Sequence, residues 1–282
     1  MGLEFRVMTL DDMGVYLRLM EIAGWGNTAD DLRRLLQYEP KGCFVASLEG
    51  EDVGMVATTN YGQVGWIGNL VVLPERRGRG IGADLMRAAM GHLLDSGVRS
   101  IRLDSVAKSV SLYGRLGFRV EYPSLRFMGK GRNHQGQGTD GMEETDLPAV
   151  IKLDRGYSGL DREQMLKRVY GDYPDLCFVA RDDGRTAGFI MAKPGEGSCR
   201  VGPWICDPER PDLARALLRS LMSEVAGGWI WVGVPALNGA SVEILGEDGF
   251  ERISTSTRMC YGECWPLGDG RAVFGIGAAD KG

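Results

Sequence analysis

The sequence predicts an α/β protein that consists of two tandem copies of one domain, and three observations support this prediction. The chain has 282 residues, which is long for one compact domain and comfortable for two of about 140 residues each. Its hydrophobic content of 44% and charged content of 25% are those of an ordinary globular protein. The short apolar sequence Cys43–Ala46 recurs as Cys177–Ala180, at an offset of 134 residues.

The repeat keeps its register well beyond that short sequence. Pro74–Arg76 recurs as Pro208–Arg210 at the same offset of 134. Further along, the offset falls to 132, where Gly117-Phe118 corresponds to Gly249-Phe250. The second copy has therefore lost two residues soon after Arg210.

The elements of the first copy follow from its hydrophobic pattern. Short apolar runs bounded by turn residues predict strands, and longer amphipathic runs predict helices. The expected strands are Glu4–Met8, Cys43–Leu48, Val53–Thr59, Trp66–Leu73, Ile101–Asp104 and Arg119–Phe127. The expected helices are Asp11–Ile22, Ala29–Tyr38, Gly82–Leu94 and Ser109–Arg115.

A polar stretch separates the two copies. Residues 129–145 contain five glycines, a composition typical of a flexible connection. We therefore expect a first domain at residues 1–130, a linker at residues 131–145 and a second domain at residues 146–282.

The most informative segment of the first copy is a basic, glycine-rich loop that joins an apolar strand to an amphipathic helix. Gly78, Gly80 and Gly82 remove side chains that would keep an anion away from the backbone. Consecutive N–H groups can then face one concavity at the positive end of a helix dipole. Arg76, Arg77 and Arg79 add positive charge, so the pattern predicts a pyrophosphate-binding loop.

Two other types of phosphate-binding loop fit this segment less well. The loop lacks the pattern G-x-x-x-x-G-K-[ST], which excludes a nucleoside triphosphatase loop here. Gly78-x-Gly80-x-x-Ala83 also fits a relaxed dinucleotide-binding fingerprint, with Asp104 at the end of the following strand. In that fold the first glycine closes the turn directly after the strand, whereas here Pro74–Arg77 intervene. The dinucleotide-binding fold is therefore the weaker interpretation.

The spacing Arg77-x-x-Gly80-x-Gly82, with a strand before it and a helix after it, resembles the acetyl-CoA signature of the GCN5-related N-acetyltransferase (GNAT) family. The resemblance implies two tandem GNAT-like domains, each a mixed, mostly antiparallel sheet flanked by helices. It also implies that acetyl-CoA is a co-substrate. The cofactor-binding residues that it implies are Leu70, Val71, Val72, Arg77, Gly78, Arg79, Gly80, Ile81 and Gly82.

The same resemblance indicates catalytic residues. Tyr113 lies in a Ser-Leu-Tyr-Gly-Arg-Leu-Gly-Phe sequence like the family motif in which a tyrosine hydroxyl reaches the CoA sulfur. A phenol with a pKa of about 10 stays protonated at neutral pH and can donate its proton to the leaving thiolate. By resemblance, the Leu70 N–H faces the thioester oxygen, and Val72 bonds the pantetheine arm as an added strand would. Asn69 is a third candidate, for orienting a water or the amine, although strand asparagines are as often structural.

The general base has no clear candidate. Many members of the family carry a glutamate earlier on this strand, but the corresponding residue, eleven positions before Arg77, is Trp66. Asp30, Asp31 and Glu21 could add negative charge near the acceptor, because the first two helices flank it in relatives. A solvated helix face is the simpler explanation of these three carboxylates.

The second copy keeps the fold pattern and loses the chemistry. After Arg210 its loop contains no glycine, Pro211 supplies no N–H donor, and Asp212 adds a negative charge. The residue that corresponds to Tyr113 is Leu245. We expect a degenerate domain that does not bind acetyl-CoA.

Composition excludes several other classes of partner. A net charge of −5 without a long basic stripe argues against nucleic acid. No apolar run approaches the roughly 18 residues of a membrane helix and no signal peptide is visible, so we expect no membrane association and a cytoplasmic protein. Six cysteines without C-x-x-C spacing and only two histidines argue against a metal site and favour reduced, buried thiols. The oligomeric state is left open.

Together these observations predict an acetyl-CoA-dependent N-acetyltransferase that acts on the primary amine of a small molecule, by direct attack in a ternary complex. The alternative is a non-catalytic acyl-CoA sensor or scaffold, in which the first copy binds CoA and the second contacts a partner. Tyr113 favours catalysis, because a sensor needs no acid at the sulfur.

Overall fold

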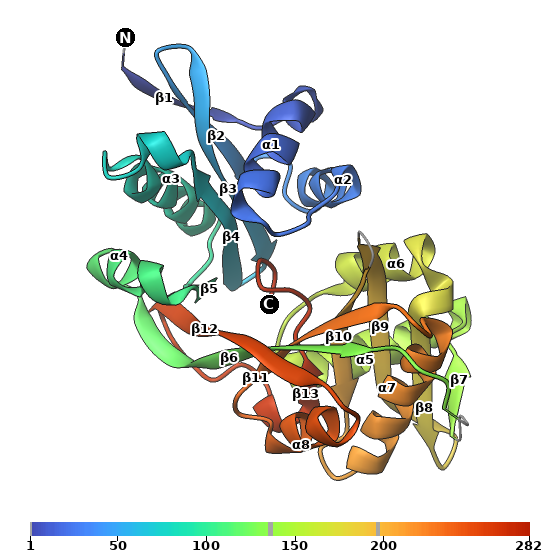
Figure 1. The fold of residues 1–282 in the computed structure, drawn as a ribbon. Helices are drawn as coiled ribbons and strands as arrows, with labels where there is room; N and C mark the ends of the chain where they lie inside the picture. The colour runs from blue at the N-terminus through green and yellow to red at the C-terminus, as the bar shows by residue number, and fades with distance from the viewer. Residues whose placement is uncertain (1, 135–137, 196–197) are drawn as a thin grey trace. The chain divides into compact units, whose positions relative to one another are not determined.

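The structure is a computed structural model that describes residues 2–134, 138–195 and 198–282, and the chain divides into two compact units (Figure 1). The first unit comprises the chain up to Val120 together with Met259–Cys264 and Ala279–Gly282. The second unit comprises Glu121–Arg258 and Trp265–Ala278. Both are α/β units, which confirms the predicted fold class.

The first unit follows the predicted order of elements, and no expected boundary is displaced by more than three residues. Its strands are β1 (Leu3–Val7), β2 (Cys43–Leu48), β3 (Glu51–Tyr61), β4 (Val64–Val72) and β5 (Ser100–Ser105). Its helices are α1 (Met13–Ala23), α2 (Ala29–Tyr38), α3 (Ile81–Asp95) and α4 (Val110–Arg115).

The sheet of this unit is mixed. Strands β1 to β4 pair antiparallel in sequence order, and β5 pairs parallel to β4. Helix α3 covers one face of the sheet, and α1 and α2 cover the other (Figure 1). Fully buried side chains from both layers form the core, including Leu19, Leu32, Val45, Met55, Leu85 and Leu93. A rigid sheet with helices on both faces thus supports the glycine-rich loop.

Local signals fix where the first two helices end and begin. Helix α1 ends at Gly24, which adopts a left-handed φ of 68°. Helix α2 begins after Thr28, whose side chain and that of Asp31 form a reciprocal capping box. Because Asp31 bonds back to the start of its own helix, its carboxylate is held inward.

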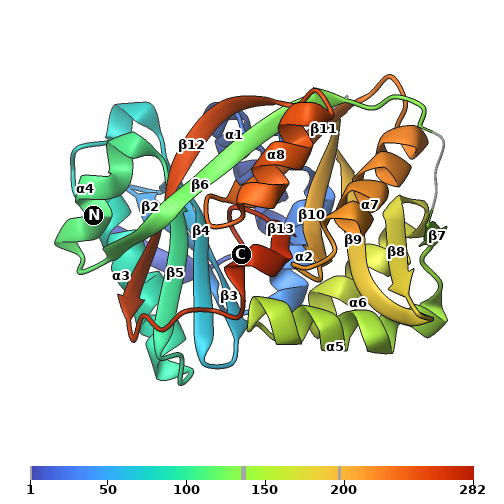
Figure 2. The same cartoon turned by 90° about the horizontal axis from the view of Figure 1, so that it is seen from below.

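The second unit repeats the plan of the first. Its strands are β6 (Arg119–Lys130), β7 (Thr139–Gly141), β8 (Cys177–Asp182), β9 (Arg185–Gly195), β10 (Ser198–Cys206), β11 (Trp229–Pro235), β12 (Glu251–Gly262) and β13 (Val273–Gly275). Its helices are α5 (Leu147–Ser158), α6 (Glu163–Asp172), α7 (Pro211–Glu224) and α8 (Gly239–Glu247). Figure 2 shows α5 and α6 on one side of β8 to β10 and α7 on the other. No helix in the described ranges is both long and apolar enough to span a bilayer.

The units divide at positions other than those expected. Residues 121–130, which the sequence assigns to the first domain, lie in the second unit, where β6 pairs antiparallel with β11. Met259–Cys264, which includes the end of β12, lies in the first unit. Both strands are the last strand of their own copy, so their sequences do not show which sheet each one joins.

The expected linker is also different in part. Within residues 131–145, Thr139–Gly141 form β7, which pairs antiparallel with β8. Residues 135–137 of the expected linker lie outside the described residues. A polar, glycine-containing segment can still form an edge strand, because an edge needs partners on one side only.

The expectation that all six cysteines are reduced is wrong for two of them. Cys260 and Cys264 form a disulfide whose Cα atoms lie 5.9 Å apart. Gly262, with φ of 79°, turns the chain between them, and spacing alone did not reveal this turn. The other four cysteines are free and buried, and burial raises the pKa of Cys43, for example, to about 12.

Candidate active site

Strand β4 carries an irregularity at the residues expected to face the thioester. Its pairing with β3 shifts register between Gly68 and Val71, so Asn69 and Leu70 together oppose a single residue of β3. Asn69 adopts a left-handed φ of 52°, which is uncommon for a residue other than glycine. Such a β-bulge interrupts the ladder and redirects the backbone at Leu70.

Strand β4 separates from β5 just before this bulge. The parallel pairs between the two strands end at Trp66 and Arg102. In the described structure, the edge of β4 from Ile67 to Val72 is therefore unpaired on the β5 side. A free strand edge offers backbone groups to an extended ligand, as in the addition of a further strand.

The glycine-rich loop follows directly. Gly78 and Gly80 adopt left-handed φ values of 76° and 85°. A Cβ added at Gly78 would meet no atom within 4 Å, and one at Gly80 would meet only Asp84 Oδ2, at 4.0 Å. Glycine is thus needed at both positions because of their left-handed φ values. The space beside the backbone is open and is not filled by other protein atoms.

The loop presents a run of uncommitted donors at the start of α3. The N–H groups of Ala83 and Asp84 bond to the Gly80 carbonyl, at 2.9 and 3.1 Å. Within the described part of the chain, the five N–H groups from Gly78 to Gly82 donate to no protein acceptor. The first N–H groups of a helix lack intrahelical partners and lie at the positive end of its dipole. The loop therefore fits a pyrophosphate.

The three arginines of the loop differ in their partners. Arg76 forms an ion pair with Glu51, at 2.6 Å, so its charge is neutralised locally. Arg77 Nε donates to the carbonyl of Val72, at 2.9 Å, which ties the loop to the end of β4. Arg79 is exposed and has no ion pair among the described residues. Arg79 is thus the arginine whose charge is available to an anion.

Tyr113 lies in the short helix α4 and is 9% exposed. Its ring meets Phe118 edge-on, with centroids 6.0 Å apart. Burial raises the pKa of Tyr113 to about 12. The phenol is therefore protonated across the physiological range, as a proton donor must be.

A group of buried polar side chains lies beside β4, on α1, α2 and the loop between them. The Tyr16 hydroxyl accepts a hydrogen bond from Asn27 Nδ2, at 3.1 Å. Burial raises the pKa of Tyr16 far above its ordinary value, and the nearby carboxylates of Asp31 and Asp280 add to this shift. Arg34 lies 3.6 Å from Asp31, and both side chains are less than a tenth exposed. The buried carboxylate of Asp31 and the partly exposed carboxylate of Asp280 therefore lie near one phenol.

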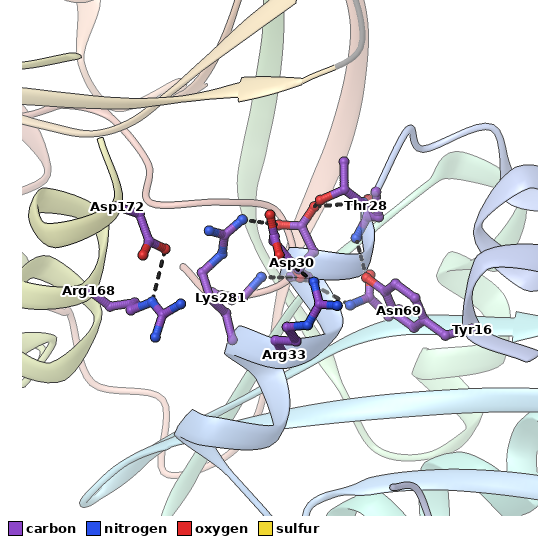
Figure 3. Close-up of polar contacts among 12 residues, drawn as sticks. Tyr16, Thr28, Asp30, Arg33, Asn69, Arg168, Asp172 and Lys281 are labelled. Carbon is purple, nitrogen blue, oxygen red and sulfur yellow. Dashed lines mark hydrogen bonds and ion pairs between the residues drawn. The ribbon is translucent and has the colours of Figure 1, made fainter. Parts of the chain in front are cut away.

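The carboxylates on the first two helices, Asp30, Asp31 and Glu21, differ in their exposure. Asp31 turns inward, with its Oδ2 accepting from the Thr28 N–H at 2.9 Å. Asp30 points outward and pairs with exposed Arg33 at 2.6 Å (Figure 3). Glu21 is exposed. The solvated-face interpretation holds for Asp30 and Glu21 and is wrong for Asp31.

The segment Ala279–Gly282 was not expected from the sequence, and it lies against β3 and β4 in the first unit. Asn69 Nδ2 donates to Asp280 Oδ2 at 3.1 Å (Figure 3). The Trp66 indole Nε1 donates to the carbonyl of Ala279 at 3.2 Å. The Tyr61 hydroxyl donates to the carbonyl of Lys281 at 2.7 Å. No periodicity or motif marks this short polar segment, so sequence patterns could not reveal it.

The equivalent region of the second unit is built differently. Parallel pairing of β10 with β11 ends at Val201, and β13 then pairs with β10 at Trp204 and Ile205. The loop after β10 contains Arg210, which forms ion pairs with Asp182 and Asp212 at 2.5 and 2.8 Å. Leu245, at the position of the tyrosine, is fully buried. Among the residues that the structure describes, this unit has neither a free strand edge at β10 nor an uncommitted arginine at its loop.

Comparison with known proteins gives two domain matches. Residues 13–118 match the family described as "Acetyltransferase (GNAT) family", and residues 150–275 match the one described as "Acetyltransferase (GNAT) domain". The two matches lie in the two predicted copies.

Individual relatives agree with these matches. An acetyltransferase of Sodalis glossinidius is 30% identical over 138 residues, which are 45% of this chain and 94% of that protein. The N-alpha-acetyltransferase MAK3 of Arabidopsis thaliana is 35% identical over 86 residues, and the chain spans only 45% of its length. A crystal structure of a putative acetyltransferase from Pyrococcus horikoshii covers all of this chain and 96% of its own, with a TM-score of 0.84 and 22% identity. That likeness supports the fold.

Proposed function

Because this chain belongs to the GNAT acetyltransferase family, we propose that its first unit transfers the acetyl group of acetyl-CoA to the primary amine of a small molecule. One observation carries the proposal: the free edge of β4 leads directly into five uncommitted N–H groups at Gly78 to Gly82. A pantetheine arm on the strand edge would continue into a pyrophosphate on the loop. The second unit, with β13 on the equivalent strand edge, takes no CoA.

The proposed reaction is direct attack in a ternary complex. The amine nitrogen bonds to the thioester carbonyl carbon, and the Leu70 N–H in the β-bulge stabilises the oxyanion. The C–S bond then breaks, the amine loses its extra proton to solvent, and the thiolate takes a proton from Tyr113. The raised pKa of Tyr113 keeps that proton available, and the phenolate is reprotonated from water before the next turnover.

The experiment is a screen of amino acids, polyamines, aminoglycosides and simple alkylamines with acetyl-CoA, with free thiol as the readout. An acetyltransferase releases thiol only with an accepted amine. An acyl-CoA sensor would bind acetyl-CoA in calorimetry and release no thiol with any amine.

Tyr113→Phe tests the proposed acid. We expect turnover to fall by about 10- to 1000-fold with CoA affinity nearly unchanged, because the variant removes only a group that acts at the departing sulfur. Tyr157→Phe is the matched control, since Tyr157 lies on α5 in the second unit. Unaltered turnover in Tyr113→Phe would show that the thiolate leaves without this residue.

A further inference from the structure

The segment Ala279–Gly282 fits β4 closely. A Cβ added at Gly68 would lie 2.3 Å from Cβ of Asp280, and a Cβ added at Gly282 would lie 2.8 Å from Cζ3 of Trp66. Both distances are far below an ordinary carbon contact, so glycine is needed at Gly68 for the segment to approach. With three hydrogen bonds from Tyr61, Trp66 and Asn69, the segment is a built part of the first unit.

The segment carries a shielded pair of opposite charges. Lys281 Nζ donates to Asp280 Oδ2 at 2.6 Å, and only 6% and 16% of the two side chains are exposed (Figure 3). The same Asp280 oxygen accepts from Asn69 Nδ2 at 3.1 Å. A carboxylate so shielded needs a cation or several donors, because burying an unpaired charge is costly.

This pair lies next to the atoms that the proposed function uses. Asn69, which holds Asp280, directly precedes Leu70 in the β-bulge. The Trp66 indole on the same strand holds Ala279, the residue before Asp280. The segment thus brings a carboxylate beside β4 from more than 200 residues away in sequence.

We propose that Asp280 binds the ammonium group of the acceptor, and that Lys281 occupies the same carboxylate as an internal competitor until the acceptor displaces it. The bound ammonium loses one proton to solvent before its nitrogen attacks the thioester carbon. This inference rests on the proposed function and narrows its substrate to primary alkylammonium compounds. A neutral acceptor, such as an alcohol, would replace none of the positive charge that the Lys281 ammonium places on this carboxylate.

The test uses the full chain and n-butylamine, which presents the same ammonium on the same alkyl chain as Lys281. Binding is followed by ligand NMR and turnover by thiol release. Asp280→Asn keeps the size of the side chain and an acceptor for Asn69 while removing the charge. It should raise the Kd and KM for n-butylamine by about 10- to 100-fold, as expected for a lost charged hydrogen bond.

The opposite change is expected at the neighbouring residue. Lys281→Met removes the competing ammonium and keeps the stem, so the Kd and KM for n-butylamine should fall by about 3- to 10-fold. Asp30→Asn and Lys108→Met are the matched controls, since Asp30 and Lys108 are exposed in the same unit. Neither control should change these constants.

Three results would overturn the inference. One is a change in the same direction in both variants, which indicates a structural ion pair. Another is binding of n-butylamine to Lys281→Met without acetylation, and the third is no binding to either the wild type or Lys281→Met. CoA affinity, measured by calorimetry in each protein, tests the proposed function separately: if CoA fails to bind even the wild type, the proposed function fails first.

Discussion

In both units two parallel strands separate, but the strand edge that becomes free is unpaired in the described part of the first unit and paired in the second. In the first unit β4 and β5 part after Trp66, and the edge of β4 stays unpaired within the described structure. In the second unit β10 and β11 part after Val201, and β13 pairs with the edge that becomes free. An unpaired edge is a ready template for an extended ligand, and a paired edge is part of the core. The two copies thus keep one fold while they differ in whether this strand edge is paired in the described structure.

The loops that follow these strands differ in the same sense. The loop before α3 has free N–H donors and an uncommitted Arg79. In the loop before α7, Arg210 is neutralised by Asp182 and Asp212, and Pro211 offers no donor. Within the described residues, backbone donors and charge therefore both favour an anion at the loop of the first unit over that of the second.

The largest effect, a loss of folding, should come from cutting the chain near the domain boundary that the sequence suggests. A fragment of residues 1–135 lacks Met259–Cys264 and Ala279–Gly282 of the first unit and carries residues 121–130, which belong to the second. We expect this fragment not to fold, because its sheet lacks its last strand. Circular dichroism and thermal melting against the full chain check this. A cooperative melt together with CoA binding in the fragment would show that the first unit is independent of residues 259–282.

The next largest effect concerns the occupied strand edge of the second unit. Phe274 in β13 is fully buried and packs on Trp204, with ring centroids 5.3 Å apart. Phe274→Ala should lower the free energy of unfolding by about 3–5 kcal/mol, as large-to-small core changes do. CoA affinity should stay unchanged, because β13 lies in the other unit. Denaturant melts and calorimetry measure the two quantities.

The control for this change is Ile253→Ala, since Ile253 lies in the same unit and is 39% exposed. Its effect on unfolding should be within about 0.5 kcal/mol. A loss of CoA affinity in folded Phe274→Ala would mean that the second unit contributes to cofactor binding, and the contrast between the two strand edges would fail.

A smaller effect, on CoA affinity, is expected from substituting a single glycine of the first loop. Gly80→Asp places a side chain and a negative charge in the space beside the free N–H groups, and should weaken CoA binding by about 100-fold. Gly184→Asp is the matched control, because Gly184 has a φ of 76° and open space at its Cβ position. Both variants carry the same backbone strain and charge. Equal CoA affinity in the two would show that the loop does not hold the pyrophosphate.

The sequence predicted what depends on local pattern. Strand and helix bounds, the bulge-bearing strand and the glycine loop all follow from residues close together in the chain. The assignment of Met259–Cys264 and Ala279–Gly282 to the first unit depends on contacts across more than 100 residues, which no period or motif encodes. Asp31 shows the same limit within a helix. Its position in the sequence is typical of a solvated residue, and only the hydrogen bond with Thr28 in the structure shows that its carboxylate turns inward. The roles proposed for Tyr113 and Leu70 stay predictions until kinetics test them.

The smallest expected effect is on CoA affinity, and it is tested by substituting one arginine from each loop. Arg79 is exposed and has no ion pair in the described structure, so its charge is available to a phosphate. Arg79→Ala should weaken CoA binding by roughly 5-fold, about 1 kcal/mol, because an exposed charge is strongly screened by water. The difference should shrink in high salt, since a shorter Debye length screens exposed charges further. Arg210→Ala should leave CoA affinity unchanged at every salt concentration, because Asp182 and Asp212 already hold that guanidinium. Calorimetry at low and high salt measures both, and a matching loss in Arg210→Ala would show that the second loop also meets the cofactor.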